Sequence, residues 1–159
     1  MKTNEAGRKI APFPHRYTVR LVDRQLVAPP RAPIAAGPPP QFGGPDTAWS
    51  PEELLVAAAL ECLWTTFDAH ARRDALAVHD WSGTGVAVLD KGTPVPAFTS
   101  ITLRVELMVS PGDEDRARRL LQTAEQRCII SNALRVPVIL EAIVGSPGLA
   151  GSQPVEHAS

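Results

Sequence analysis

The sequence lacks a long apolar run, has no excess of charge of either sign and contains only two cysteines. No stretch reaches the roughly 18 to 20 consecutive apolar residues that a membrane-spanning helix needs. The basic N-terminus, residues 1–9, is not followed by an apolar segment, so we expect no secretory signal and a cytoplasmic protein. Lys plus Arg is 16 and Asp plus Glu is 17, which argues against a dedicated surface for nucleic acid or for an anionic membrane.

Several sequence signatures of chemistry are also missing. The four histidines are scattered, and none lies at metal-ligand spacing from a cysteine or an acidic residue, so we expect no metal. Gly43-Gly44 is too short for a nucleotide-binding loop, so we expect no bound cofactor. The Gly-x-Ser-x-Gly elbow of serine hydrolases does not occur. The two cysteines, Cys62 and Cys128, are the remaining candidates for chemistry.

The composition is typical of one globular domain. A chain of 159 residues is long enough to bury a core, and 44% apolar with 21% charged residues is usual for such a protein. We expect a flexible lead over residues 1–14, a single domain over 15–144 and a loose, Gly/Ser/Pro-rich tail over 145–159. In a cytoplasmic protein both cysteines should rest as thiols, so a disulfide between them would be transient.

The first part of the domain predicts a strand and then an irregular segment. Residues 15–22 alternate and are rich in β-branched and aromatic types, as is typical of a strand. Residues 28–40 are rich in proline, which donates no ladder hydrogen bond. This segment is therefore an edge strand, an extended arm or a polyproline linker.

The clearest predicted element is a helix that begins at Ser50. Ser50 can cap the helix, Pro51 suits its first position, and Glu53 completes a capping box with Ser50. Apolar residues then surround the helix for about three turns, until polarity returns near His70. We expect this helix to be central and buried.

The rest of the chain predicts a hairpin, a second helix and a last strand. Residues 75–90 and 98–109 alternate, and 91–94 supply a turn between them. An amphipathic helix follows to about residue 126, and residues 136–144 are typical of a strand. This order predicts an α+β fold rather than a regular β-α-β alternation.

The residues alone leave the role of the cysteines open. Cys62 lies in the apolar helix and Cys128 near the end of the amphipathic one. A free cysteine is often a small buried hydrophobe. A reactive thiol needs a cation or a hydrogen-bond donor that favours the thiolate. The charged residues before Cys62 that could supply such surroundings are Arg20, Arg24, Arg31, Glu52 and Glu53.

Two sequence blocks carry a resemblance to a known family. The first comprises Phe42-Gly43-Gly44, Trp49 to Leu55 and Ala57 to Cys62, and the second runs from Cys128 to Leu134. In this order and at this separation they resemble the two signatures of the OsmC/Ohr family (osmotically inducible protein C and organic hydroperoxide resistance protein). The sequence Trp49-Ser50-Pro51-Glu52 resembles the OsmC branch of the family more than the Ohr branch. The resemblance implies antiparallel β-sheets around a long buried central helix, in an intertwined homodimer.

The resemblance also assigns roles to individual residues. Cys62 matches the peroxidatic cysteine and Cys128 the resolving cysteine. Glu52 matches the glutamate that holds an active-site arginine. Arg24 is the first choice for that arginine, and Arg20 is the second.

The activity implied is thiol-dependent reduction of organic hydroperoxides to alcohols in oxidative-stress defence. Cys62 would attack the peroxide and become a sulfenic acid, Cys128 would condense with it to a disulfide, and an external dithiol would reduce that disulfide. Apolar side chains such as Leu63, Phe67 and Ile129 either line a pocket for such a substrate or belong to the core.

Two other functions stay open. A non-catalytic protein of the same fold could bind a small molecule or sense redox state, and Glu61 favours this because a small residue is usual there in the family. A cysteine hydrolase that pairs Cys62 with His70 is disfavoured, because eight helical residues separate the two by about 12 Å.

The spacing of Glu52 and Cys62 bears on assembly. Ten helical residues rise about 15 Å, so Glu52 cannot touch Cys62 of its own chain if the helix is continuous. Glu52 could then act only on another subunit's site or through a long bridging arginine. This spacing independently favours a homodimer with composite sites.

Overall fold

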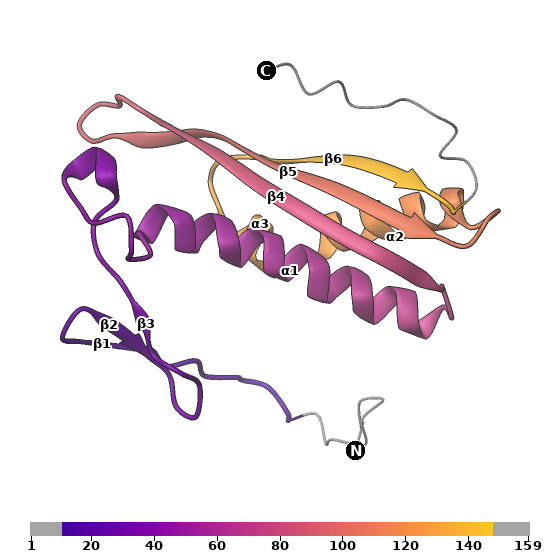
Figure 1. Ribbon diagram of the computed structural model, residues 1–159, viewed down its shortest axis with the longest axis horizontal. Helices are drawn as coiled ribbons and strands as arrows, with labels where there is room; N and C mark the ends of the chain where they lie inside the picture. Colours follow the sequence, from indigo (N-terminus) through magenta and orange to yellow (C-terminus); the bar gives the residue numbers. More distant parts are fainter. Residues whose placement is uncertain (1–10, 148–159) are drawn as a thin grey trace, which may run out of the picture. The chain divides into compact units, whose positions relative to one another are not determined.

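The computed structural model describes residues 11–147, and their contacts divide the chain into two compact units (Figure 1). The first unit ends at Pro51 and the second begins at Glu52. Most of the expected lead, 1–14, and of the expected tail, 145–159, lies outside the described residues. A single domain over 15–144 stays a prediction.

The first unit contains a small antiparallel sheet of three short strands. They are β1 (Arg20–Val22), β2 (Gln25–Val27) and β3 (Ile34–Ala35), in the order β1-β2-β3. The strand expected over 15–22 is wrong in its first half, since only Arg20–Val22 finds a partner. The proline-rich segment contributes only β3, because proline has no N–H for a ladder. A short 3-10 helix, η1 (Pro40–Phe42), follows.

The second unit contains all but the first residue of the helix α1 (Pro51–Arg73), which starts directly after Ser50 as the sequence predicts. The expected burial of this helix is found along one stripe of its surface. The opposite side, which includes Glu61 and Thr65, is exposed. The buried stripe consists of Ala59, Leu63, Phe67, His70 and Ala71.

A second three-stranded sheet packs beside α1. The predicted hairpin is confirmed as β4 (Val78–Asp90) and β5 (Ala97–Val109), and β6 (Val138–Gly145) completes the order β4-β5-β6. One detail of the expected antiparallel sheets is wrong, because β6 lies parallel to β5. The reason is the connection between them, a helical crossover built from α2 (Glu114–Arg127) and α3 (Ile129–Ala133).

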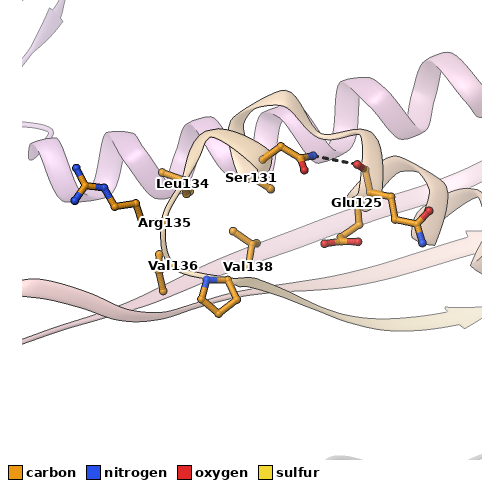
Figure 2. Close-up of a pocket in the computed structure, with 9 residues that line it drawn as sticks. Glu125, Ser131, Leu134, Arg135, Val136 and Val138 are labelled. Atoms are coloured by element: carbon orange, nitrogen blue, oxygen red, sulfur yellow. Dashed lines mark hydrogen bonds between the residues drawn. The ribbon is translucent and has the colours of Figure 1, made fainter.

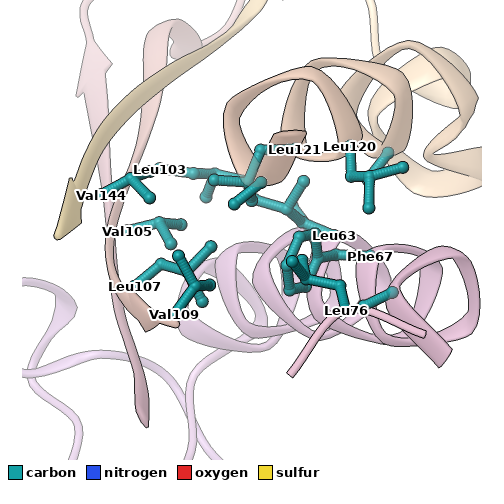
Figure 3. Close-up of a cluster of buried hydrophobic side chains, with 14 of the residues drawn as sticks. Leu63, Phe67, Leu76, Leu103, Val105, Leu107, Val109, Leu120, Leu121 and Val144 are labelled. Carbon is teal, nitrogen blue, oxygen red and sulfur yellow. The ribbon is translucent and has the colours of Figure 1, made fainter. Parts of the chain in front are cut away.

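The core of the second unit lies between this sheet and the helices α1 and α2 (Figure 3). Alternate residues of β5 point inward and are almost completely buried, as the period of two requires. The buried face of α2, which includes Leu121 and Ala124, packs into the same cluster. This packing fixes the end of α2, and therefore the start of α3, against α1. The inward residues of β5 are Ile101, Leu103, Val105, Leu107 and Val109.

Candidate active site

Cys62 lies near the middle of α1 and is partly exposed. It follows the buried Ala59 by three residues, so both lie on the same side of the helix. Its neighbour Glu61 is exposed, and successive helix positions point about 100° apart. The thiol therefore lies at the boundary between the buried stripe of α1 and solvent.

Cys128 occupies the break between α2 and α3. Its φ of −64° and ψ of 112° are extended, so the chain leaves the helical path here and starts α3. The side chain is 0% exposed. Its thiol lies 4.0 Å from the carbonyl oxygen of Ala59 on α1. The end of α2 thus carries Cys128 to the turn of α1 that precedes Cys62.

Ser131 donates two hydrogen bonds to the sulfur of Cys128. The Ser131 backbone N–H lies 3.4 Å from Cys128 Sγ, and the Ser131 hydroxyl oxygen lies 3.1 Å from it. The sulfur is the side-chain cap of α3, a role that Ser, Thr, Asp or Asn usually fills. Cys128 and Ser131 both belong to the second sequence block. Their spacing of three residues was the one sequence signal that Ser131 could donate to this sulfur.

The two cysteines are free, and they lie close enough for Cys62 to affect the pKa of Cys128. Burial raises the pKa of the Cys128 thiol above its ordinary value, and the neighbouring Cys62 raises it further. The two donors from Ser131 act in the opposite direction and lower that pKa. The arrangement is therefore a pair of neighbouring thiols, a buried one held by donors and a partly exposed one on α1.

Glu52 lies in the first turn of α1 and not beside Cys62. Because α1 is continuous over both residues, the helix rise separates them by about 15 Å. The oxygen Oε2 of Glu52 is buried and has no hydrogen-bond partner among the residues that the structure describes. Such an oxygen is costly to bury without a donor.

The arginines predicted for the site belong to the first unit. Arg20 opens β1, and Arg24 lies in the turn between β1 and β2 with a φ of 59°. Both side chains are exposed. The two cysteines and Glu52 lie in the second unit, so the role of either arginine stays a prediction.

The apolar residues near Cys62 do not share one pocket. Leu63 and Phe67 are 0% exposed and belong to the core, whereas Ile129 is 77% exposed. Trp64 packs against Trp81 of β4, with ring centroids 4.8 Å apart. The sequence left open whether these side chains line a substrate pocket or belong to the core, and Leu63 and Phe67 belong to the core.

His70 is buried near the C-terminal end of α1. It is 8% exposed, and its Nδ1 has no hydrogen-bond partner in the part of the chain that the structure describes. Burial lowers the pKa of His70, and the nearby Arg73 and Arg127 lower it further. On the continuous helix it lies about 12 Å from Cys62, too far for the hydrogen bond of a hydrolase pair.

A hollow of about 520 Å³ opens beside α3 (Figure 2). Ser131 lines it, but neither cysteine does. Its wall combines apolar side chains, such as Leu134 and Val136, with the charged Glu125 and Arg135. The amide of Asn132, which also lines the hollow, donates to the backbone oxygens of Gln126 and Cys128 at 3.0 and 2.8 Å and braces α3.

Metal ligands and membrane spans can be assessed for residues 11–147. Within that range no group of three or more His, Cys, Asp or Glu side chains could hold a metal ion. None of the helices in the same range combines the length and the apolar character needed to cross a membrane.

Comparison with known proteins gives a consistent picture. A family model described as OsmC-like protein matches residues 44–141. The uncharacterized protein YmaD of Bacillus subtilis is 29% identical over 112 residues, which are 67% of this chain and 75% of that protein. The crystal structure of an OsmC-like protein from Mycoplasma pneumoniae has a TM-score of 0.70 at 13% identity and covers 84% of this chain and 99% of its own.

A hydroperoxide resistance protein is among the similar structures. The organic hydroperoxide resistance protein OhrB of Bacillus subtilis has a TM-score of 0.60 at 22% identity, over 82% of this chain and 98% of that one. At such identities the likeness concerns the fold, α+β with two sheets and helices. The family match covers the first sequence block from Gly44 onward and the whole of the second.

Proposed function

This chain belongs to the OsmC-like family, and from that premise we propose that it is a thiol-dependent hydroperoxide reductase. The observation that carries the proposal is the placement of two free thiols close together, since Cys128 Sγ lies 4.0 Å from the carbonyl oxygen of Ala59, one turn before Cys62, and Cys62 affects the pKa of Cys128. The partly exposed thiol can meet a peroxide, and the buried thiol is already next to it.

The reaction begins at Cys62. Its thiolate attacks the terminal oxygen of an organic hydroperoxide, the O–O bond breaks, and Cys62 becomes a sulfenic acid while the alkoxide leaves and takes a proton from solvent to give the alcohol. Cys128 then attacks the sulfenic sulfur, releases water and closes a disulfide. The closure is short-range, because Cys128 Sγ already lies beside the turn of α1 that precedes Cys62.

The thiolate of Cys62 needs a cation, and we propose that an arginine supplies it. Arg24 is the first candidate and Arg20 the second. The buried, unpartnered Oε2 of Glu52 is a suitable anchor for a guanidinium group, since a bidentate carboxylate fixes an arginine in place. Because Glu52 is about 15 Å from Cys62 in one chain, we propose that the site is completed in a homodimer.

The remaining partners follow from the chemistry. An external dithiol returns the disulfide to two thiols, and no metal or organic cofactor takes part. The protein would act in the cytoplasm, where such dithiols are kept reduced, in defence against oxidative stress. Nucleic acid and membranes are not partners in this proposal.

One observation favours a second candidate, a non-catalytic protein that binds a small molecule or senses redox state. The hollow beside α3 is large enough for a small ligand and contains neither cysteine. Ser131 connects the hollow to Cys128, so a ligand there could report on the state of that thiol. In this case the thiols would be slow toward peroxides.

Intact mass measurement separates the two candidates. One equivalent of cumene hydroperoxide added to the reduced protein should remove two thiols and about two daltons, the mass of the two hydrogens lost with the disulfide. The variant Cys62→Ser should keep its remaining thiol, whereas Cys128→Ser should stop at the sulfenic acid. Survival of both thiols for minutes in excess peroxide would refute the peroxidase and favour the binding protein.

A further inference from the structure

The two sulfurs of the candidate site have very different surroundings. Cys128 Sγ is completely buried and receives two hydrogen bonds from Ser131, at 3.4 Å from the N–H and 3.1 Å from the hydroxyl. Cys62 is partly exposed on α1. A disulfide between them would therefore present one sulfur to solvent and keep the other against fixed donors.

We propose that Ser131 is a catalytic residue that directs the external dithiol to Cys62, because it stabilises Cys128 as the leaving thiolate. This inference rests on the proposed peroxidase function and adds the direction of its reductive half. Two features of the geometry support this proposal. Cys62 is partly exposed, so an attacking thiol can reach it, and the two hydrogen bonds from Ser131 stabilise a negative charge on Cys128.

The step can be written with all atoms and electrons. A thiolate of the dithiol attacks Cys62 Sγ, the Cys62–Cys128 bond breaks, and its electron pair leaves with Cys128 as a thiolate. The second thiol of the reductant, once deprotonated, attacks the reductant's own sulfur in the mixed disulfide and releases Cys62 as a thiolate. The dithiol is oxidised by two electrons to a cyclic disulfide, and the protein disulfide is reduced to two thiols.

The donors matter because the leaving thiolate is otherwise disfavoured. A thiolate in an apolar interior is poorly solvated and leaves slowly, since leaving depends on a low thiol pKa. Hydrogen bonds to an ionised acceptor are stronger than those to a neutral one. Ser131 therefore gains interaction energy as charge develops on Cys128, which is the condition for catalysis rather than simple binding.

The direction of attack can be measured without peroxide. The disulfide is formed with diamide, treated briefly with the monothiol 2-mercaptoethanol, quenched with acid and labelled with a maleimide. Peptide mass spectrometry should then find the mercaptoethanol adduct on Cys62 and the maleimide on Cys128. An adduct mainly on Cys128, or no disulfide with diamide, would overturn the inference.

The role of Ser131 is tested by three variants. Ser131→Ala should slow reduction by dithiothreitol by about tenfold, the loss of one hydrogen bond to a charged group. Ser131→Thr should restore the rate, and Ser82→Ala, at an exposed serine of β4, should not change it. Wild-type speed in Ser131→Ala would refute the role.

A pH titration excludes a purely structural effect. In the Cys62→Ser background, the ultraviolet absorbance of the thiolate reports Cys128 alone. Adding Ser131→Ala should move its midpoint to higher pH, and Ser131→Thr should return it. If the midpoint stays in place while reduction slows, Ser131 acts through the fold and not on the sulfur.

Failure here differs from failure of the proposed function. If diamide yields the disulfide and the adduct forms on Cys62 but peroxide oxidises neither thiol, the peroxidase proposal falls and the directed exchange stands. If peroxide closes the disulfide but the adduct forms on Cys128, only the directed exchange falls.

Discussion

At the scale of single residues, His70 makes the stability of the fold depend on pH. Burial lowers its pKa below the ordinary 6.5, and Arg73 and Arg127 lower it further, although Asp74 raises it. The folded state then binds the proton more weakly than the unfolded state does. The contribution of His70 to the free energy of unfolding is therefore fully present above pH 6.5. It is lost as the pH falls through the lowered pKa of folded His70.

Urea unfolding at pH 7.5 and pH 5 tests this linkage. The midpoint should fall more between the two pH values in the wild type than in His70→Gln, which cannot titrate at this site. The matched control is His79→Gln, because His79 is exposed and bonds the Ser110 hydroxyl at 3.1 Å. If the urea midpoint falls equally in the wild type and in His70→Gln, carboxylates and not His70 cause the loss of stability at low pH.

The sequence predicted the cysteine pair at this scale but not its surroundings. Cys62 and Cys128 come from two recognisable blocks, and the structure brings their thiols together. Ser131 was missed as a donor because its role depends on where the chain breaks between α2 and α3. Arg24 was chosen over Arg20 only by its distance from the Gly43-Gly44 turn, because the proline-rich segment between them has no regular pattern that fixes the alignment.

At the scale of elements, two glycines let β4 pack closely on α1. Gly83 and Gly85 face the helix, and a Cβ at Gly85 would collide with Cγ1 of Val56. A Cβ at Gly83 would lie 2.9 Å from Cδ1 of Leu60, the end of a flexible side chain. Valine is stiff at χ1 and cannot move aside as leucine can.

We expect Gly85→Ala to destabilise the protein by about 1–3 kcal/mol through overpacking. Gly83→Ala, the matched control, should cost less than about 1 kcal/mol, because Leu60 can change rotamer. Denaturant unfolding measures both. Combining Gly85→Ala with Val56→Ala should cost less than the sum of the two single changes, and strict additivity would contradict the collision.

The local sequence pattern predicted most helices and strands. It failed where the extent or orientation of a strand depends on the strand that it pairs with. Ser50 and Pro51 mark the start of α1, and the alternation in β4 and β5 gives the hairpin. The orientation of β6 depends on the crossover through α2 and α3, which no local period encodes. Residues 15–22 alternate like a strand, but a strand forms only where a partner is available.

At the scale of the whole molecule, several features favour association with a second copy. Val86 and Val88 are exposed on β4, and Ile143 is 71% exposed on β6. The register places all three on the sheet face opposite the buried residues of β5. Exposed apolar side chains on one face are typical of an interaction surface. With the unpartnered Oε2 of Glu52, they support a dimer with composite sites.

Mixed dimers test whether Glu52 of one chain serves Cys62 of the other. Cys62→Ser and Glu52→Ala should each lose most activity when alone, the second because the arginine loses its anchor. In a composite arrangement, a dimer of one chain of each kind contains one intact site. Random mixing makes half of the dimers mixed, so peroxidase activity should return to about one quarter of the wild-type value.

The control for this experiment is a mixture in which both changes sit on the same chain. Wild type co-refolded with the double variant Glu52→Ala, Cys62→Ser gives mixed dimers with no intact composite site, because each site lacks one residue. Its activity should therefore come from wild-type dimers alone, about one quarter of that of pure wild type. If Glu52 served its own chain instead, the first mixture would stay inactive and this one would reach about half.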